Sequence, residues 1–228
     1  DHLEIDVSIS ANHHLVAGLL EKGFRAGVET YQLSEGRIMN YAFFNPHYPD
    51  AYLRWARRCL EHRSFVGIKI HPRRAECFAE DDRWEPVWQL ASEFSVPILA
   101  HTWWVSDYNP GQRYATPDRF ERFVKTYPDA NLILGHAGWR DDGNRAAAEL
   151  MQAYDNVYVD FAGDIYWFRV VEWFVSQVGH ERILFGSDAT LIDSRTALGR
   201  ILDADISTEA KVAILGGNAA DLFALTPR

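Results

Sequence analysis

The sequence predicts an α/β fold in which a parallel sheet is surrounded by helices. Short apolar runs typical of buried parallel strands alternate with helical patterns along the chain. Three of these runs each end in a His or Asp, and such polar residues at strand ends are typical of the carboxyl edge of a β/α barrel. A doubly wound open sheet is the alternative, but the glycine-rich phosphate turn usual after its first strand is missing. No linker or change of composition divides residues 1–228, so we expect a single domain.

Seven apolar runs are predicted to be strands. They cover residues 3–9, 37–44, 65–70, 96–101, 131–136, 156–161 and 182–187. Segments of helical length separate them, and this alternation places the strands parallel to one another with helices outside the sheet.

Helical patterns lie between the strands. Residues 12–21 and 51–62 are predicted to be helices, and three further segments repeat apolar residues at helical spacing. These stripes are Trp84-Val87-Trp88-Ala91-Phe94, Phe120-Phe123-Val124-Tyr127 and Phe168-Val171-Val175-Val178. We interpret them as helix faces packed on the sheet. Pro117 is predicted to open the second of these helices and Pro128 to end it. Gly216 and Gly217 are expected to break or cap a helix.

The composition excludes several classes of function. A formal net charge of −9 argues against nucleic acid, which requires a clustered basic face. Cys59 and Cys77 are too few for a disulfide framework and fit a reducing, cytoplasmic compartment. No apolar run approaches the roughly 20 residues of a membrane span, and no signal peptide opens the chain. The chain lacks an initiator Met and begins almost within a strand-like run, so we expect it to be shortened at its N-terminus.

Three predicted strands end in a potential metal ligand or acid/base group. These are His101 in VPILAHTWW, His136 in NLILGHAGW and Asp188 in RILFGSDAT. The carboxyl ends of parallel strands meet at one face, so the three side chains should converge on one pocket. Each alone could cap a strand or bond to local backbone, but that alternative does not explain the coincidence.

Imidazoles and a carboxylate from separate strands suit Zn²⁺ or a similar divalent ion with one position open for water. The ion would lower the pKa of that water and polarise a substrate carbonyl, and a nearby unligated His or Asp would take the proton. One His–Asp pair is fewer than the three or four protein ligands of a tight site.

Further residues are predicted to line this pocket. Trp103, Trp104 and Trp139 could form a wall that excludes water and shapes an organic substrate, or could shield the barrel rim. Lys69 lies in an apolar run, where it could bind an anionic group, bridge a metal if carboxylated, or form a buried ion pair. His71 is a further candidate, although Pro72 ends the strand there.

Two other signals are weaker. Asp160 and Asp164 flank the end of the strand at 156–161 and could line the pocket, but helix capping is the commoner use of such residues. A serine hydrolase would need a G-x-S-x-G elbow, and the nearest run, Gly186-Ser187-Asp188, lacks the second glycine.

Five motifs together resemble the amidohydrolase superfamily, in particular its amidohydrolase-related branch of aminocarboxymuconate-semialdehyde-decarboxylase type. They are GIKIHP (67–72), PILAHT (97–102), LILGHAG (132–138), ILFGSD (183–188) and NAADLF (218–223), in the family's order and over essentially the whole chain. The resemblance implies a distorted (β/α)8 TIM barrel with a divalent metal ion, often as a homodimer. It implies that His101 is a metal ligand and Asp188 a ligand or proton acceptor. His136 would be the acid/base residue or, in two-metal relatives, a further ligand.

The sequence departs from this family at the first strand, whose His-x-His supplies two metal ligands. One alignment matches residues 5–10 to that strand, with Ser8 and Ser10 in place of the histidines. The preferred alignment makes residues 1–10 the family's second strand, so that the chain holds strands 2–8 and the first lies upstream. In both alignments the chain carries only part of a metal site. A barrel without one strand also has two unpaired edges.

We therefore expect a metal-dependent hydrolase that cleaves a C–N or C–O bond of a small organic acid, amide or lactone. His101 and Asp188 would hold the metal ion, and His136 would move the proton. One alternative is a non-oxidative decarboxylase on the same scaffold, in which His136 protonates the carbon. The other is a catalytically silent binding barrel with a decayed metal site. The expected partner is a small-molecule substrate, with neither nucleic acid nor membrane.

Overall fold

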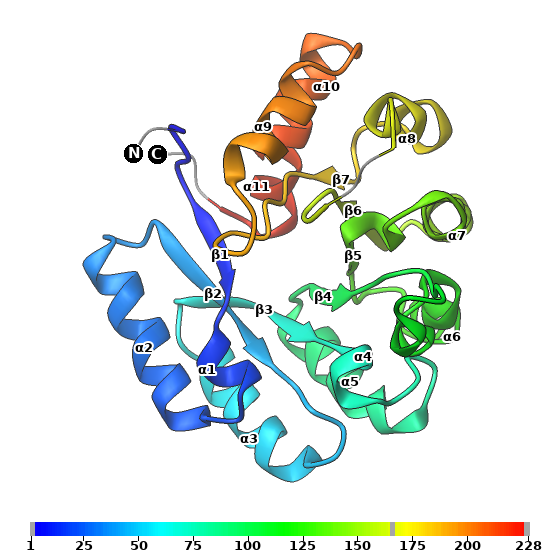
Figure 1. Ribbon diagram of the computed structural model, residues 1–228. Coiled ribbons are helices and arrows are strands. Elements are labelled where there is room, and N and C mark those ends of the chain that lie inside the picture. Colours follow the sequence, from blue (N-terminus) through cyan, green and yellow to red (C-terminus); the bar gives the residue numbers. More distant parts are fainter. Residues whose placement is uncertain (1–2, 165–166, 226–228) are drawn as a thin grey trace.

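A computed structural model of the chain describes residues 3–164 and 167–225. Their strands form one curved parallel sheet with helices on its outer side (Figure 1). The strands are β1 (Ser8–Ala11), β2 (Ile38–Phe43), β3 (Phe65–Ile70), β4 (Ile98–His101), β5 (Leu132–Gly135), β6 (Val157–Asp160) and β7 (Ile183–Leu184). Each strand pairs with the next along the chain, which gives the sheet order β1-β2-β3-β4-β5-β6-β7. This order confirms the predicted TIM-barrel-like α/β fold with seven strands.

The connections between strands are mostly helical. The helices are α1 (His13–Val16), α2 (Leu20–Leu33), α3 (Pro49–Leu60), α4 (Pro72–Ala75), α5 (Glu85–Phe94), α6 (Glu121–Thr126), α7 (Asp141–Ala153), α8 (Val170–Val178), α9 (Ser194–Leu202), α10 (Thr208–Val212) and α11 (Asn218–Leu222). Short 3₁₀ turns cover Asp82–Trp84, Pro110–Tyr114, Pro117–Phe120 and His136–Gly138. None of the helices in the described part of the chain combines the length and apolar character needed to cross a bilayer.

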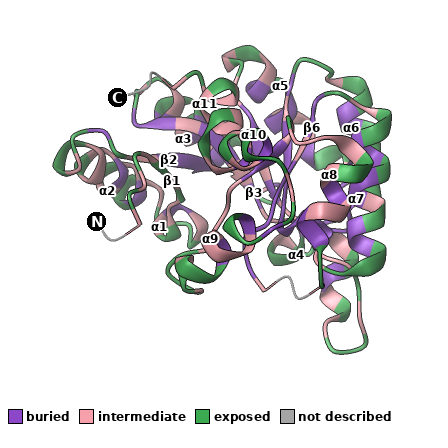
Figure 2. Cartoon of the chain, turned by 90° about the horizontal axis from the view of Figure 1, so that it is seen from above, coloured by how far each residue is buried: buried purple, intermediate pink, exposed green. Residues whose placement is uncertain are grey.

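The core lies between the sheet and the helices, where the buried residues of Figure 2 concentrate. Trp88 of α5 is fully buried and stacks on Phe123 of α6, with ring centroids 5.5 Å apart. The aromatic stripes of these two segments therefore are helix faces, as predicted. The third stripe was wrong at its start: Phe168 is 89% exposed and precedes α8, whose buried face begins at Val170.

The first strand begins later than predicted. The sequence placed it at residues 3–9, but β1 is Ser8–Ala11, and its ladder starts where Ser8 N–H donates to the Arg37 carbonyl. Upstream, the Arg37 guanidinium donates to the carbonyls of Ile5 and Asp6, so these acceptors are taken by a side chain instead of a strand. Residues 1–2 of the preferred alignment lie outside the described residues, as do residues 226–228.

Three other boundaries differ from the prediction. The helix expected at 12–21 is two helices, because Gly18 takes a left-handed conformation (φ 83°) between α1 and α2. β7 is two residues long instead of the predicted 182–187, since β6 is its only neighbour among the described strands. Gly216 and Gly217 do not end a helix: they lie in a π-helical turn, Ala213–Gly217, between α10 and α11.

Candidate functional site

The carboxyl ends of β3 and β4 bring two predicted site histidines into contact. β3 and β4 pair in parallel, with Ile70 opposite Ala100, so His71 and His101 follow at neighbouring positions. Their rings stack with centroids 4.1 Å apart and an interplanar angle of 20°. His71 Nδ1 accepts a hydrogen bond from the main-chain N–H of Arg74 (3.3 Å), which caps the short helix α4. His101 Nε2 lies 3.1 Å from Oε1 of Gln112.

Aromatic rings extend this pair toward β5. His136 lies edge-on to His101 (5.0 Å) and to Trp103 (5.3 Å), and Trp103 stacks on Trp139 at 4.7 Å. Two of the three predicted tryptophans therefore form a wall beside the histidines. Trp104 makes no such ring contact in the described chain, and its main-chain N–H donates to the Gly138 carbonyl (3.0 Å).

The surroundings of His136 determine which ring nitrogen carries hydrogen. Its Nδ1 lies 3.0 Å from the main-chain carbonyl of Ala162, which can only accept, so Nδ1 carries the hydrogen of the neutral ring. Its main-chain N–H donates to Asp160 Oδ1 (2.9 Å). The arrangement leaves Nε2 as the nitrogen that can exchange a proton with a bound molecule.

Burial changes the charge of several side chains in this strand-end cluster, which comprises Lys69, His71, His101, His136, Asp160 and Asp188. It lowers the pKa of His71 to about 3, with further lowering by Lys69, and it lowers the pKa of His101 well below the usual range. Both imidazoles are therefore neutral at neutral pH. Burial also lowers the pKa of Lys69 to about 8, while the carboxylates of Asp160 and Asp188 oppose this shift. Below pH 8 Lys69 thus carries the positive charge of the cluster.

Lys69 has no direct partner for this charge among the described residues. No hydrogen bond or ion pair joins its Nζ to any residue in the ranges 3–164 and 167–225. Asp188, which follows β7, is partly buried, and its charge raises the pKa of Lys69 without a direct contact. Its backbone is in the left-handed region (φ 55°). The buried ion pair considered for Lys69 is therefore not formed within the described residues, and the charge of its ammonium group acts on the imidazoles of His71 and His101.

The sequence interpretation undervalued Asp160 and missed Tyr41 and Gln112. Asp160 ends its strand in the same pattern as His101, so the sequence does carry a signal for it, although helix capping is the commoner use of such a residue. Tyr41 on β2 is buried, and burial together with the Asp160 charge raises the pKa of its phenol. Neither Tyr41 nor Gln112 belongs to a strand-end motif, and only the fold shows that they approach the cluster.

The donor set does not complete a metal site. His101 and Asp188 are the predicted ligands, but no group of three or more His, Cys, Asp or Glu side chains arranged to hold a metal ion occurs among the described residues. A tight divalent-metal site uses three or four protein ligands. His101 and Asp188 therefore supply only part of such a site among the described residues.

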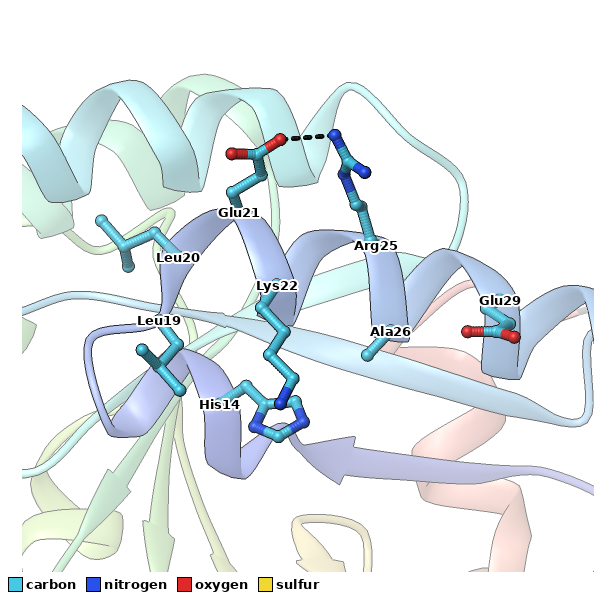
Figure 3. Close-up of a pocket in the computed structure, with 8 residues that line it drawn as sticks. All are labelled: His14, Leu19, Leu20, Glu21, Lys22, Arg25, Ala26 and Glu29. Carbon is cyan, nitrogen blue, oxygen red and sulfur yellow. Dashed lines mark hydrogen bonds and ion pairs between the residues drawn. The ribbon is translucent and has the colours of Figure 1, made fainter.

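A separate surface depression of about 720 Å³ lies along α1 and α2 (Figure 3). It is lined by His14, Leu19, Leu20, Glu21, Lys22, Arg25, Ala26 and Glu29. Two of these, Glu21 and Arg25, form an exposed ion pair along α2 (2.6 Å; Figure 3). None of the strand-end residues lines this depression, so it does not belong to the cluster.

Comparison with known proteins gives a family and a fold. The family profile described as Amidohydrolase matches residues 8–225. A search of curated proteins found no match.

Several solved structures share the fold at low sequence identity. 5-Carboxyvanillate decarboxylase from Sphingomonas paucimobilis is 17% identical with a TM-score of 0.73, covering 95% of this chain and 75% of its own. 2,6-Dihydroxybenzoate decarboxylase from Rhizobium is 17% identical with a TM-score of 0.72, covering 95% and 80%. A dihydroxybenzoic acid decarboxylase from Polaromonas, solved with bound manganese, is 18% identical with a TM-score of 0.71, covering 99% and 80%.

Proposed function

Because the chain belongs to the amidohydrolase family, we propose that it is an enzyme that removes CO2 from a small aromatic or dienoic carboxylic acid without oxidation. The observation that carries this proposal is the ammonium group of Lys69, which no described residue pairs with, beside the stacked, neutral rings of His71 and His101. The solved structures with this fold include decarboxylases of hydroxylated benzoic acids, which supports decarboxylation over the hydrolysis that the sequence favoured.

The cluster has features that suit an aromatic acid. Lys69 would neutralise an anionic oxygen of the substrate, an interaction that is strong in a partly buried site. The stacked indoles of Trp103 and Trp139 would give a substrate ring an apolar neighbour beside the histidines. The Nε1 hydrogen of Trp139 is buried and has no acceptor in the described chain, so it is free to donate to a substrate oxygen.

His136 would supply the proton. In the reaction, the bond between the ring carbon and the carboxylate breaks, CO2 leaves, and the electron pair stays on carbon. His136 Nε2, after taking a proton from solvent while Nδ1 keeps its own hydrogen, would give that proton to the carbon to form the new C–H bond, which returns the imidazole to its neutral form. The Ala162 carbonyl holds Nδ1–H throughout, so that Nε2 faces the reacting carbon.

We also propose that His101 and Asp188 are two ligands of a divalent ion, zinc or manganese. Support comes from their strand-end positions and from the manganese bound to the Polaromonas decarboxylase. At least one more protein ligand than these two would be needed, so no chemical step is assigned to the ion.

Hydrolysis of an amide or lactone is the second candidate. The observation that favours it is the same Nδ1–H bond, because it leaves a lone pair on Nε2 that could take a proton from water.

The test is a substrate screen with the purified protein, supplemented in turn with Mn²⁺, Zn²⁺ or chelator. 2,6-Dihydroxybenzoate and 5-carboxyvanillate would be followed by ultraviolet absorbance and CO2 release, and aryl lactones and amides by product formation. We expect loss of the acids with stoichiometric CO2, abolished in His136→Gln and retained in the exposed control His13→Gln.

Turnover of lactones or amides without CO2 would contradict decarboxylation and favour hydrolysis. Elemental analysis of the same preparations would test the metal ligands: about one divalent ion per chain, lost in His101→Ala and Asp188→Asn, is expected. Retention of the ion in both variants would overturn the assignment.

A further inference from the structure

Asp160 is the last residue of β6, and its carboxylate is buried within the strand-end cluster. Oδ1 accepts two main-chain hydrogen bonds, from the N–H groups of His136 and Ala162, both at 2.9 Å. Oδ2 has no hydrogen-bond partner within residues 3–164 and 167–225. Helix capping does not account for this arrangement, because the next helix, α8, begins only at Val170.

The neighbouring strands leave room for this carboxylate. A Cβ on Gly135 of β5 would lie 3.7 Å from Asp160 Oδ2, and one on Gly186 would lie 2.9 Å from Asp160 Cγ. A side chain at Gly186 would therefore displace the carboxyl group. Glycine at position 186 therefore allows Asp160 to keep its place, whereas a Cβ at position 135 would make only an ordinary contact with it.

The backbone that Asp160 holds is unfavourable for residues with a Cβ. His136 has φ 68° and Ala137 has φ 46°, both in the left-handed region. Such a conformation persists only where the surrounding structure fixes it. At His136 the bond from its N–H to Asp160 does so.

The second bond of Oδ1 acts on the imidazole. Ala162 donates its N–H to Asp160, and the carbonyl of the same residue accepts the hydrogen on His136 Nδ1 at 3.0 Å. One carboxylate oxygen therefore fixes both the main chain of His136 and the main-chain group that orients its ring.

We propose that Asp160 is a positioning residue that fixes the backbone and ring tautomer of His136, so that Nε2 is presented to the substrate. This inference rests on the proposed function, in which His136 moves the proton. Asp160 acts through His136 and does not touch the reacting atoms.

Three variants separate this role from simple filling of space. Asp160→Ala removes both acceptors. Asp160→Asn keeps a carbonyl oxygen that can accept the same two N–H groups, so it should rescue the geometry. Asp164→Asn changes the next carboxylate along the chain, a partly buried residue with no described partner, and is the matched control. If Asp160→Ala does not fold, Asp160→Leu replaces it, because leucine fills the volume without an acceptor.

The direct readout is a long-range ¹H–¹⁵N spectrum of the histidine rings, with the His136 signals identified by their absence in His136→Gln. We expect hydrogen on Nδ1 in the wild-type protein, in Asp160→Asn and in Asp164→Asn, and a mixture of tautomers in Asp160→Ala. With a substrate from the screen, kcat should fall about 10²-fold in Asp160→Ala with little change in KM, as for a misplaced catalytic group.

An unchanged His136 tautomer in Asp160→Ala, or equal loss in Asp160→Asn and Asp160→Ala, would overturn the proposal. The spectrum needs no turnover. If it responds as expected while the wild-type protein consumes no acid, the positioning role stands and the proposed function fails.

Discussion

Lys69 shows how one side chain can be unfavourable for folding and useful for binding. Its ammonium group is largely withdrawn from water, and no described carboxylate pairs with it directly. Burial of an unpaired charge costs free energy, which is why the pKa of Lys69 falls to about 8. A substrate anion would supply the missing partner.

Lys69→Met should therefore weaken anion binding and stabilise the fold. We expect at least a tenfold loss of affinity for a benzoate by calorimetry at pH 7. We also expect a gain in the free energy of unfolding on the order of 1–2 kcal/mol, since methionine fills similar space without charge. Lys125→Met, on the exposed face of α6, is the control and should change neither quantity.

The pH dependence of stability shows whether the charge of Lys69 destabilises the fold. The pKa of Lys69 is about 8 in the folded protein against 10.5 unfolded, so the unfolded chain binds more protons between these values. Wild-type stability should then rise with pH from about 8 to 10.5, and the advantage of Lys69→Met should vanish there. Anion affinity should decrease as pH passes 8. A stability difference unchanged up to pH 11 would show that the charge is not its cause.

At the scale of elements, Asn218 attaches the C-terminal helices to the shortest strand. Asn218 is the first residue of α11, and its Nδ2 donates to the carbonyls of His180 (2.6 Å) and Ile183 (2.8 Å). β7 has only two residues and one neighbouring strand in the described sheet. The helix therefore stabilises the strand that leads to Asp188, which gives the NAADLF motif a structural role.

Asn218→Ala should cost about 1–3 kcal/mol in the free energy of unfolding, because two carbonyls lose their donor. Urea unfolding would measure this value. Asn131→Ala, which removes an amide without a described side-chain partner at the start of β5, is the matched control. Equal costs for the two variants would mean that the paired carbonyls do not matter.

At the scale of the whole molecule, the sheet is curved but has two ends. β1 and β7 each pair with one strand, β2 and β6 respectively, whereas β2 to β6 pair on both sides within the described residues. Edge strands expose backbone groups to water, so they open more easily than central strands.

Hydrogen exchange should follow this topology. Amides of Ser8–Ala11 and Ile183–Leu184 should exchange faster than those of β3, β4 and β5 in the intact protein. Mass spectrometry of peptic peptides would resolve the difference. Uniform protection across all seven strands would indicate that both ends are covered in solution, for example by another copy of the chain.

The sequence alone determined the strand count, the parallel order and the positions of His101, His136 and Asp188. These follow from local pattern: buried strands are apolar, and polar residues at their carboxyl ends must lie at one face. Boundaries were less accurate where a long-range contact or the conformation of a single residue decided them. The Arg37 guanidinium takes the carbonyls before β1, and a glycine in left-handed conformation separates α1 from α2.

Only the tertiary structure decided how the site residues meet. Three features depend on groups far apart in the chain: the stacking of His71 on His101, the tautomer of His136, and the absence of a partner for Lys69 among the described residues. Asp160 shows the difference most clearly. Its strand-end position could be seen in the sequence, but one of its two backbone partners, His136, follows the neighbouring strand β5, and the other, Ala162, lies two residues further along the chain. The local sequence pattern determines the strand end at which a residue lies, and tertiary packing determines which groups its side chain contacts.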